Sequence, residues 1–471
     1  MSYPADVCIF INALYTWLDI FDLILPPFYL VIIYFVAHKL VESKINSHGQ
    51  CHYRYLIPGL SFKIIGGIFL CLIYTYYYKD GGDVTNYFLT ARTFVEVLYD
   101  GNLSLFSDML HFKSSNIHLS GVFSKEYGPV FFRHNDYYAL FTVVLAIPVV
   151  IIGCKSFITS TIVLCVISFY ALWKLYEVFL DVYPNFSQSL AIAIFFIPSV
   201  FFWGSGILKD TFSMFSLSMF INGMYQTMIL KRKSIIHYSW LIIASYFLIN
   251  IKPYVLFALL PGTLIWLNFS RVQKIKNQAF KLFILPLILV FIVISVLVLL
   301  QVLGQYLGEY SLDNILQKAV KTQKDLVREQ YGENYYNIGS FDATILGVLS
   351  KVPAALNMAI FRPYIWDANN PVMLLSGIEN AIILFFTILI IIRLRIKILF
   401  KSLFGQPLLL FSLLFSLFFA FSVGLTTANY GALVRLKIPF VPFYAATLLV
   451  LYELNKDQMS ISSIFNRKTR K

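Results

Sequence analysis

Long apolar stretches separated by short polar segments dominate the chain from end to end. A helix that spans a membrane needs roughly 20 predominantly apolar residues. Apolar runs near that length lie at 23–37, 56–77, 137–153, 157–179, 187–203, 211–230, 235–250, 254–269, 280–303, 374–392, 406–424 and 435–453. No segment alternates polar and apolar residues over about ten positions, as a membrane β-strand does. The pattern therefore predicts an all-α, polytopic transmembrane helix bundle with about eleven or twelve spans.

Composition supports this membrane interpretation. The 471 residues are 59% apolar and 13% charged, whereas soluble domains contain roughly 45–50% apolar and about 25% charged residues. So little charge cannot cover a surface that faces water, and disorder is excluded because it requires low hydrophobicity. Apolar runs continue along the whole chain, so we expect a single integral membrane domain over residues 1–471.

The net charge of +13 comes from short basic clusters between the apolar runs. A nucleic-acid-binding surface needs one continuous basic face, so nucleic acid is excluded as a partner. The excess of Lys and Arg in cytoplasmic loops instead sets the orientation. We assign to the cytoplasm Lys39/Lys44/Arg54/Lys63, Lys231/Arg232/Lys233, Arg271/Lys274/Lys276/Lys281, Arg393/Arg395/Lys397/Lys401 and the basic tail 455–471. The amino terminus and the loops 78–136 and 304–345 then lie outside, and the carboxyl terminus is cytoplasmic.

One stretch conflicts with a simple alternation of crossings. The scheme requires an odd number of crossings between 186 and 231, but two apolar runs occur there, and Gly204-Ser205-Gly206 interrupts them. Irregular backbone inside a membrane is tolerated only where protein or a watery cavity covers it. We expect a broken or half-crossing helix around Pro198 to Asp210 that lines a cavity, and whether 187–210 crosses fully stays open.

An acidic motif, Asp80-Gly81-Gly82-Asp83, follows the second apolar run. A carboxylate at the mouth of a membrane cavity can act as a general base on a hydroxyl group. Asp83 is the preferred catalytic residue, with Asp80 in its place as the alternative. The pair could also hold a divalent metal, although no full ligand set is evident. The structural alternative is a polar turn before a helix that starts near Val84.

Other ionisable residues lie at membrane depth or at its edge, where charge is costly and usually functional. The candidates for substrate binding are Lys209, Asp210, Lys252, Arg362, Glu379 and Arg435. Lysine and arginine near a helix start suit phosphate. Each candidate also has a structural alternative as a snorkelling side chain or part of an interfacial turn or aromatic belt. If the orientation is right, these groups and the acidic motif share the outer side, as a reaction on a lipid-linked phosphate requires.

The motifs DGGDVTNY, PSVFFWGSGILKD, IKPY, FRPYIWDANNP and NYGALVRLKIP carry a resemblance. Over roughly residues 78–440 the chain resembles bacterial integral-membrane proteins of cell-surface polysaccharide biosynthesis, and more loosely the GT-C class of glycosyltransferases. In that class an acidic residue of the first large outer loop acts on a polyprenyl-phosphate-linked sugar, and Asp80 and Asp83 occupy the corresponding place. The extra span before this loop and the two glycines between the carboxylates depart from the class pattern.

The resemblance implies a glycosyltransferase at the outer face of the bacterial cytoplasmic (inner) membrane. Its partners would be a lipid-linked sugar or oligosaccharide and the membrane lipid itself. No cofactor is certain, and a divalent metal stays open. The alternatives are a polymerase or ligase that joins lipid-linked oligosaccharides, and a lipid or glycan transporter (flippase). The sugar, the acceptor, the linkage and the oligomeric state do not follow from the sequence.

Overall fold

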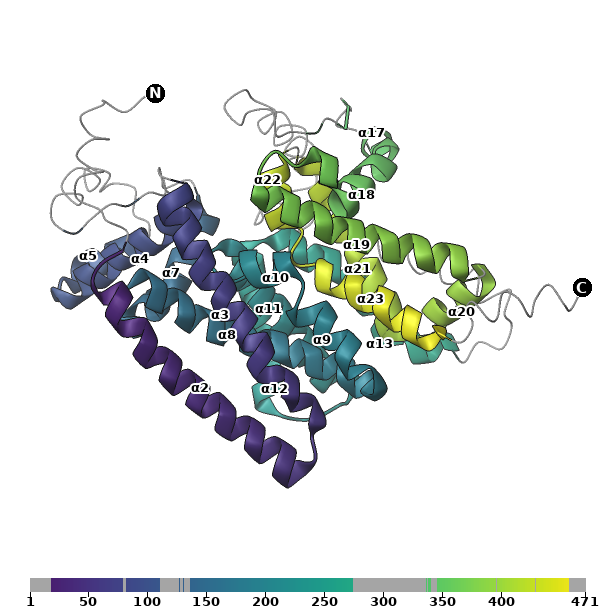
Figure 1. The fold of residues 1–471 in the computed structure, drawn as a ribbon, viewed down its shortest axis with the longest axis horizontal. Coiled ribbons are helices and arrows are strands. Elements are labelled where there is room, and N and C mark those ends of the chain that lie inside the picture. Colours follow the sequence, from purple (N-terminus) through teal and green to yellow (C-terminus); the bar gives the residue numbers. More distant parts are fainter. Residues whose placement is uncertain are drawn as a thin grey trace, which may run out of the picture. The chain divides into compact units, whose positions relative to one another are not determined.

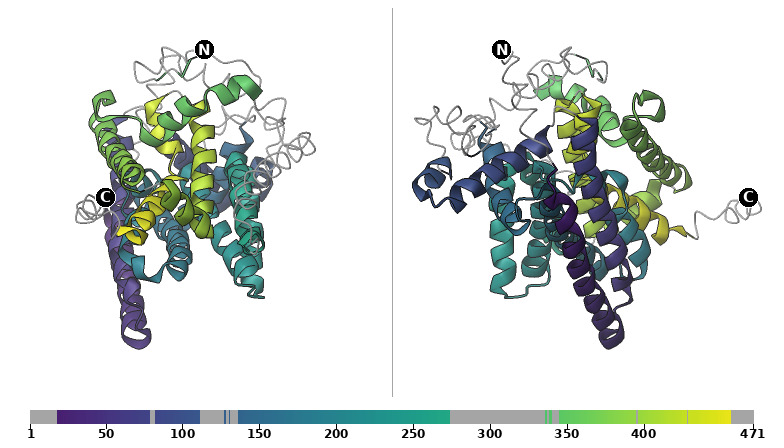
Figure 2. Two further views of the ribbon diagram at one scale, coloured as in Figure 1. Left: turned by 90° about the vertical axis from the view of Figure 1, so that its right-hand side faces the viewer. Right: turned by 60° about the vertical axis from the view of Figure 1, so that its left-hand side comes forward.

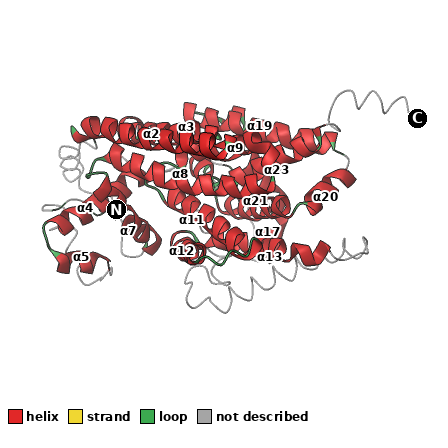
Figure 3. Cartoon of the chain, turned by 90° about the horizontal axis from the view of Figure 1, so that it is seen from below, coloured by secondary structure: helices red, strands yellow, loops and turns green. Residues whose placement is uncertain are grey.

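The predicted helical class is confirmed for the part of the chain that the structure describes. The computed structural model describes residues 18–78, 82–110, 127, 130, 136–273, 336, 338–339, 345–394, 396–427 and 429–456. Within these ranges the regular elements are helices, and no strand is drawn among them in Figure 3.

Five helical stretches of the described chain are long and apolar enough to cross a membrane, or six if one bent pair counts as a single span. The five are Phe21–His48, Cys51–Tyr77, Phe157–Val182, Pro371–Arg393 and Pro407–Thr426, and the bent pair is Tyr430–Leu436 with Val441–Leu454. Shorter apolar helices include Tyr137–Ile152, Ile235–Ile251 and Pro253–Phe269. The predicted run 280–303 lies outside the described residues, so the number of eleven or twelve spans stays a prediction.

The helices group into two compact units, and the single membrane domain over residues 1–471 stays a prediction. Unit 1 comprises Met1–Trp173 and Phe201–Phe215, and unit 2 comprises Lys174–Val200 and Ser216–Lys471. The chain thus passes from one unit to the other three times. Each unit is described by itself below.

Unit 1 begins with a pair of helices, α2 and α3, joined by a short turn (Figure 1, Figure 2). Gly49 ends α2 with a positive φ of 63°, and its N–H donates to the carbonyl of Ile45, the usual glycine stop of an α-helix. Its elements are α2 (Phe21–His48), η1 (Cys51–Tyr55), α3 (Leu56–Leu72), η2 (Ile73–Tyr77), α4 (Asp83–Tyr99), α5 (Leu103–Leu110), α7 (Tyr137–Ile152) and most of α8 (Phe157–Val182).

The predicted outer loop 78–136 contains two of these helices, α4 and α5. Helix α4 packs against α7, and its Phe88 and Phe94 are buried. The periodic spacing of apolar residues in α4 explains this, because such a stripe must be covered by a neighbouring element. The second predicted outer loop, 304–345, lies almost wholly outside the described residues.

Unit 2 has a core rich in aromatic side chains. Trp266 of α13 lies 5.2 Å from Phe411 of α21, and Phe415 lies 5.0 Å from Phe443 of α23, between ring centroids. Its elements are η4 (Pro184–Phe186), α9 (Ser187–Phe195), α10 (Pro198–Trp203), α11 (Lys209–Met224), η5 (Tyr225–Ile229), α12 (Ile235–Ile251), α13 (Pro253–Gln273), α17 (Ile345–Ser350), α18 (Val352–Phe361), η8 (Ile365–Asp367), α19 (Pro371–Arg393), α20 (Ile396–Gly405), α21 (Pro407–Thr426), α22 (Tyr430–Leu436) and α23 (Val441–Leu454). The divisions at 200/201 and 215/216 pass through α10 and α11.

Local sequence signals set the starts of the helices that carry the candidate residues of unit 2. Asn370 accepts a hydrogen bond from the Met373 N–H at the start of α19, and Asn429 does the same for Ala432 at the start of α22. A side-chain oxygen at this position satisfies a backbone donor that the helix itself leaves unpaired. These caps set the first residues of α19 and α22, Pro371 and Tyr430.

Candidate functional site

The structure divides the candidate residues between the two units. Asp83, Lys209 and Asp210 belong to unit 1, and Lys252, Arg362, Glu379 and Arg435 belong to unit 2. Asp80 lies outside the described residues. The expectation that all of these groups share one side therefore stays a prediction, and each unit supplies its own polar cluster.

In unit 1 the acidic motif forms the beginning of a helix. Asp83 is the first residue of α4, and Gly82 precedes it as the cap. The Thr85 hydroxyl donates to the Gly82 carbonyl and accepts from the Gly82 N–H, both at 2.9 Å. A carboxylate in the first helical turn is stabilised by the helix dipole. The helix predicted to start near Val84 is confirmed, and the half-buried Asp83 keeps its proposed chemical role alongside this structural one.

Lys209 forms an ion pair that the sequence pattern did not indicate. Its ammonium lies 3.3 Å from the Asp136 carboxylate, which also accepts from the Ala139 N–H at the start of α7. Lys209 is the first residue of α11, and the adjacent Asp210 is buried. The pair joins the starts of two helices, and the Lys209 side chain stays partly exposed beside it.

The predicted helix break around Pro198 to Asp210 is present. Helix α10 ends at Trp203, α11 begins at Lys209, and the residues between them are irregular. Gly206 lies so close to α3 that a Cβ would collide with Leu70, and the same Cβ would lie 3.5 Å from Val84. The break therefore adjoins the start of α4, next to Asp83.

Lys63, a residue of α3, contacts this break. Its side chain is 2% exposed, and its ammonium donates to the Gly204 carbonyl. The Ser205 hydroxyl donates to the Lys63 carbonyl at 3.0 Å. Because a helix end leaves carbonyls unpaired, Lys63 supplies a donor that α10 itself cannot. The sequence pattern placed Lys63 in a cytoplasmic basic cluster, and the structure places its side chain in the interior of unit 1. The orientation of that cluster stays a prediction.

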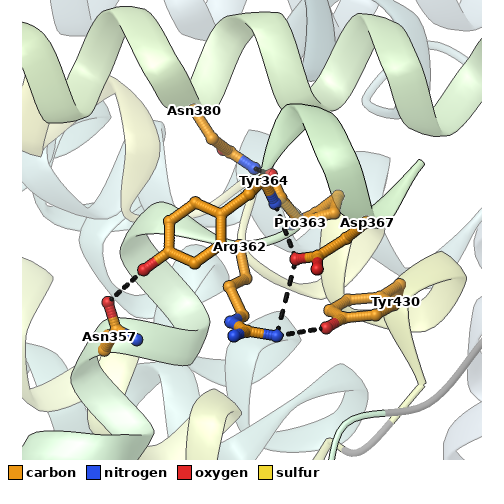
Figure 4. Close-up of polar contacts among 7 residues, drawn as sticks. All are labelled: Asn357, Arg362, Pro363, Tyr364, Asp367, Asn380 and Tyr430. Carbon is orange, nitrogen blue, oxygen red and sulfur yellow. Dashed lines mark hydrogen bonds and ion pairs between the residues drawn. The ribbon is translucent and has the colours of Figure 1, made fainter.

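Arg362 is the centre of the polar cluster in unit 2 (Figure 4). Its guanidinium donates to the Tyr430 hydroxyl at 2.6 Å and lies 3.5 Å from the Asp367 carboxylate. It also lies over the rings of Tyr336 and Tyr364, 4.2 Å and 4.8 Å from their centroids. With its side chain 20% exposed, Arg362 combines the cation and the flat aromatic faces that its sequence motif predicted.

The charge of Arg362 is secured by these neighbours. Burial acts to lower the pKa of Arg362, but the hydrogen bond to Tyr430 and the attraction of Asp367 outweigh it, and the pKa is raised. Asp367 is itself held in place, because its carboxylate accepts from the Tyr364 N–H at 2.9 Å. Only one guanidinium nitrogen of Arg362 takes part in the ion pair with Asp367, at 3.5 Å. A guanidinium can bind an anion through two parallel hydrogen bonds. Arg362 therefore keeps capacity for a further anionic oxygen.

Glu379 of α19 is buried and has partners within the protein. Its carboxylate accepts from the Ser199 N–H and from the Ser199 hydroxyl, both at 2.7 Å. Ser199 lies in the first turn of α10, directly after Pro198, so Glu379 accepts from a backbone donor that the start of this helix leaves unpaired. This arrangement gives Glu379 a structural role in addition to the predicted one in substrate binding.

A second chain of contacts starts at the neighbouring residue of α19. The Asn380 amide donates to the Pro363 carbonyl at 2.9 Å, and the Lys437 ammonium donates to the Asn380 side-chain oxygen. Lys437 is 1% exposed and lies at the bend between α22 and α23. Asn380 thus ties Lys437 to the segment that carries Arg362.

The two remaining candidates have less defined surroundings. Lys252 is buried at the end of α12, where its N–H donates to the Leu248 carbonyl. Arg435 lies half-buried in the last turn of α22, where a cation is stabilised by the helix dipole. Both positions are compatible with local structural roles.

For the metal alternative, the described residues contain no group of three or more His, Cys, Asp or Glu side chains that could hold an ion.

Comparison of the chain with protein-family models, with curated proteins and with solved structures finds no match.

Six residues of these clusters were not among the candidate site residues taken from the sequence: Lys63, Asp136, Asp367, Asn380, Tyr430 and Lys437. Four of them lie in the motifs around Arg362, Glu379 and Arg435, so their place beside a charged candidate was the available signal. Lys63 carried the same signal as Glu379, because it is a charged residue inside an apolar run, 56–77. Asp136 lies directly before the apolar run 137–153 and had no such signal.

Proposed function

We propose that the chain is a membrane glycosyltransferase that takes a sugar from a polyprenyl-phosphate donor, at the outer face of a bacterial cytoplasmic membrane. Five or six apolar helices support the placement in a membrane. The basic clusters between the apolar runs support an amino terminus outside and a carboxyl terminus in the cytoplasm. Surface polysaccharide or glycan assembly would be the process served.

The Arg362 cluster is the observation that carries the proposal. A half-buried guanidinium between Tyr336 and Tyr364 offers a charge for a phosphate and aromatic faces for a sugar ring. Trp366 lies against Tyr364, with 4.8 Å between ring centroids and an interplanar angle of 30°, and is 79% exposed, which extends the aromatic surface. A binding site for a phosphorylated sugar needs both features side by side.

The chemistry assigned to the site is a single displacement. The acceptor hydroxyl oxygen attacks the anomeric carbon, and the bond from that carbon to the phosphate oxygen breaks. Polyprenyl phosphate leaves with the electron pair of that bond, and Asp83, or Asp80 in its place, takes the hydroxyl proton. Arg362 stabilises the charge on the departing phosphate, and Lys209, Lys252 and Arg435 are further candidates for holding that phosphate.

The test is a transfer assay with purified protein and a small panel of polyprenyl-phosphate sugars, followed by mass spectrometry of the products. Arg362→Ala is expected to lower the rate by about 10²–10³-fold, and Asp83→Asn by about 10²–10⁴-fold. Arg232→Ala is the matched control, because Arg232 is exposed and its guanidinium donates to Gln226 at 2.8 Å. Transfer that survives Asp83→Asn would remove Asp83 from the mechanism, and no transfer with any donor would overturn the proposal.

A transporter or flippase is the second candidate, and the buried lysines favour it. Lys63 contacts the break after α10, and Lys437 lies at the bend between α22 and α23. Broken helices commonly line the substrate site of a transporter. A flippase would move a fluorescent lipid-linked sugar across proteoliposomes in the absence of any acceptor. A polymerase or ligase would differ from a transferase by products that contain several repeating units.

A further inference from the structure

The segment that carries Arg362 is fastened to α19 at two points. A Cβ on Gly377 would lie 3.1 Å from the Tyr364 carbonyl oxygen and 3.1 Å from the Ile365 Cα, which is tighter than most Cβ contacts, so glycine favours the close approach of α19 to this backbone. One turn further on, Asn380 donates to the Pro363 carbonyl at 2.9 Å. This carbonyl belongs to the residue directly after Arg362.

The hydrogen bond from Asn380 to the Pro363 carbonyl requires the amide nitrogen of Asn380, not its oxygen, to face Pro363. An asparagine side chain can present either its oxygen or its nitrogen, whereas an ammonium group is only a donor. Lys437 donates to the Asn380 oxygen, which leaves the amide nitrogen facing Pro363. Asn380 is fully buried and Lys437 nearly so, so water does not offer either group an alternative partner.

We infer that Asn380 and Lys437 are positioning residues for Arg362, acting through the backbone of Pro363. This inference rests on the proposed function in one respect, the assignment of Arg362 to the phosphate of the donor. Tyr430 and Asp367 hold the guanidinium from its far end, while Asn380 holds the backbone from which it projects. Without Asn380 the buried Pro363 carbonyl loses its partner, and a buried unpaired carbonyl is costly. The segment then relaxes, and the guanidinium moves away from Tyr336 and Tyr364.

Asn380→Asp tests this with little change in shape. The aspartate keeps an acceptor for Lys437 but turns a second oxygen, in place of a donor, toward the Pro363 carbonyl. Asn268→Asp is the matched control, because Asn268 also donates to a backbone carbonyl, that of Leu264 at 2.9 Å. In the transfer assay, Asn380→Asp is expected to lower kcat/KM for the lipid-linked donor by about a hundredfold, mainly through KM, while KM for the acceptor is unchanged.

A chemical readout separates the inference from the proposed function. The full-length protein in detergent is treated with phenylglyoxal, which modifies arginine, and the modification rate of Arg362 is followed by peptide mass spectrometry with Arg232 as the internal reference. In Asn380→Asp the Arg362 rate is expected to rise severalfold, because the guanidinium leaves its two aromatic rings. An unchanged rate overturns the inference.

Two further outcomes keep the inference and the function distinguishable. If Asn380→Asp does not fold, Lys437→Gln is tested instead, by the modification rate of Arg362 relative to that of Arg232. Glutamine is both a donor and an acceptor, so it no longer fixes the orientation of the Asn380 amide. If the Arg362 rate rises as expected but the wild-type chain transfers no sugar, the positioning role stands and the proposed function fails.

Discussion

Each of the two units buries a lysine at or against a break between helices, Lys63 against the break after α10 and Lys437 at the bend between α22 and α23. The surroundings of these two lysines differ. Lys63 of unit 1 contacts neutral groups: it donates to the Gly204 carbonyl, and the Cys165 thiol lies against its backbone. Lys437 of unit 2 donates to Asn380 and lies within the electrostatic influence of the Glu379 carboxylate.

This difference separates two uses of a buried cation. An ammonium that serves one carbonyl can be replaced by an apolar side chain at modest cost, because the replacement also removes the cost of burying a charge. An ammonium that balances a buried carboxylate cannot be removed alone, because the carboxylate then stays behind without its cation. We therefore expect the stability of the protein to depend much more on Lys437 than on Lys63.

The largest effect is expected for Lys437→Met. It leaves the buried Asn380 oxygen without its donor and removes a cation whose charge acts on the buried Glu379, so the free energy of unfolding should fall by about 1–3 kcal/mol. The measurement is reversible denaturation of the purified protein in mixed micelles. Lys397→Met on the exposed face of α20 is the control, and a loss no larger than in this control would contradict the charge-balancing role.

A smaller effect is expected for the coupling between Glu379 and Lys437. Glu379→Gln removes the charge but keeps one acceptor for Ser199. The double variant with Lys437→Met should be more stable than the sum of the single changes predicts, by about 0.5–3 kcal/mol. The same denaturation measurement over the four proteins of the cycle gives this value. Strict additivity would mean that the two charges do not support each other.

The smallest effect is expected for Lys63→Met. The Gly204 carbonyl loses one donor, and a hydrogen bond between membrane helices averages about 0.6 kcal/mol with a maximum near 1.7 kcal/mol. Lys39→Met on the exposed face of α2 serves as the control in the same denaturation measurement. A loss as large as that in Lys437→Met would erase the contrast between the two units.

The sequence pattern was sufficient for features that depend on neighbouring residues. The helical class, the break at Gly204-Ser205-Gly206 and the helix start after Gly82 all follow from local periodicity and from small or capping residues. Arg362 and Glu379 were recognised as candidates because charge inside an apolar run is rare. Their functional roles stay predictions.

The pattern was insufficient for pairings between distant segments. Glu379 and Ser199 are separated by 180 positions, and Asn380 and Lys437 by 57. Nothing in either segment indicates the other, because such contacts depend on how helices pack. The burial of Lys63 did not follow from the sequence for the same reason, since it depends on contact with Gly204 and Ser205, far along the chain.

The contact between Lys63 and Gly204 also has a consequence for biosynthesis. The two residues are 141 positions apart, so at about 5–20 residues per second the carbonyl is synthesised about 7–28 s after the lysine. If α3 inserts as a membrane span during that interval, its ammonium costs about 2.5–3.5 kcal/mol at mid-depth. The leucines, isoleucines and phenylalanines of Leu56–Leu72 must offset this cost alone, before the partner that the ammonium holds in the finished protein exists.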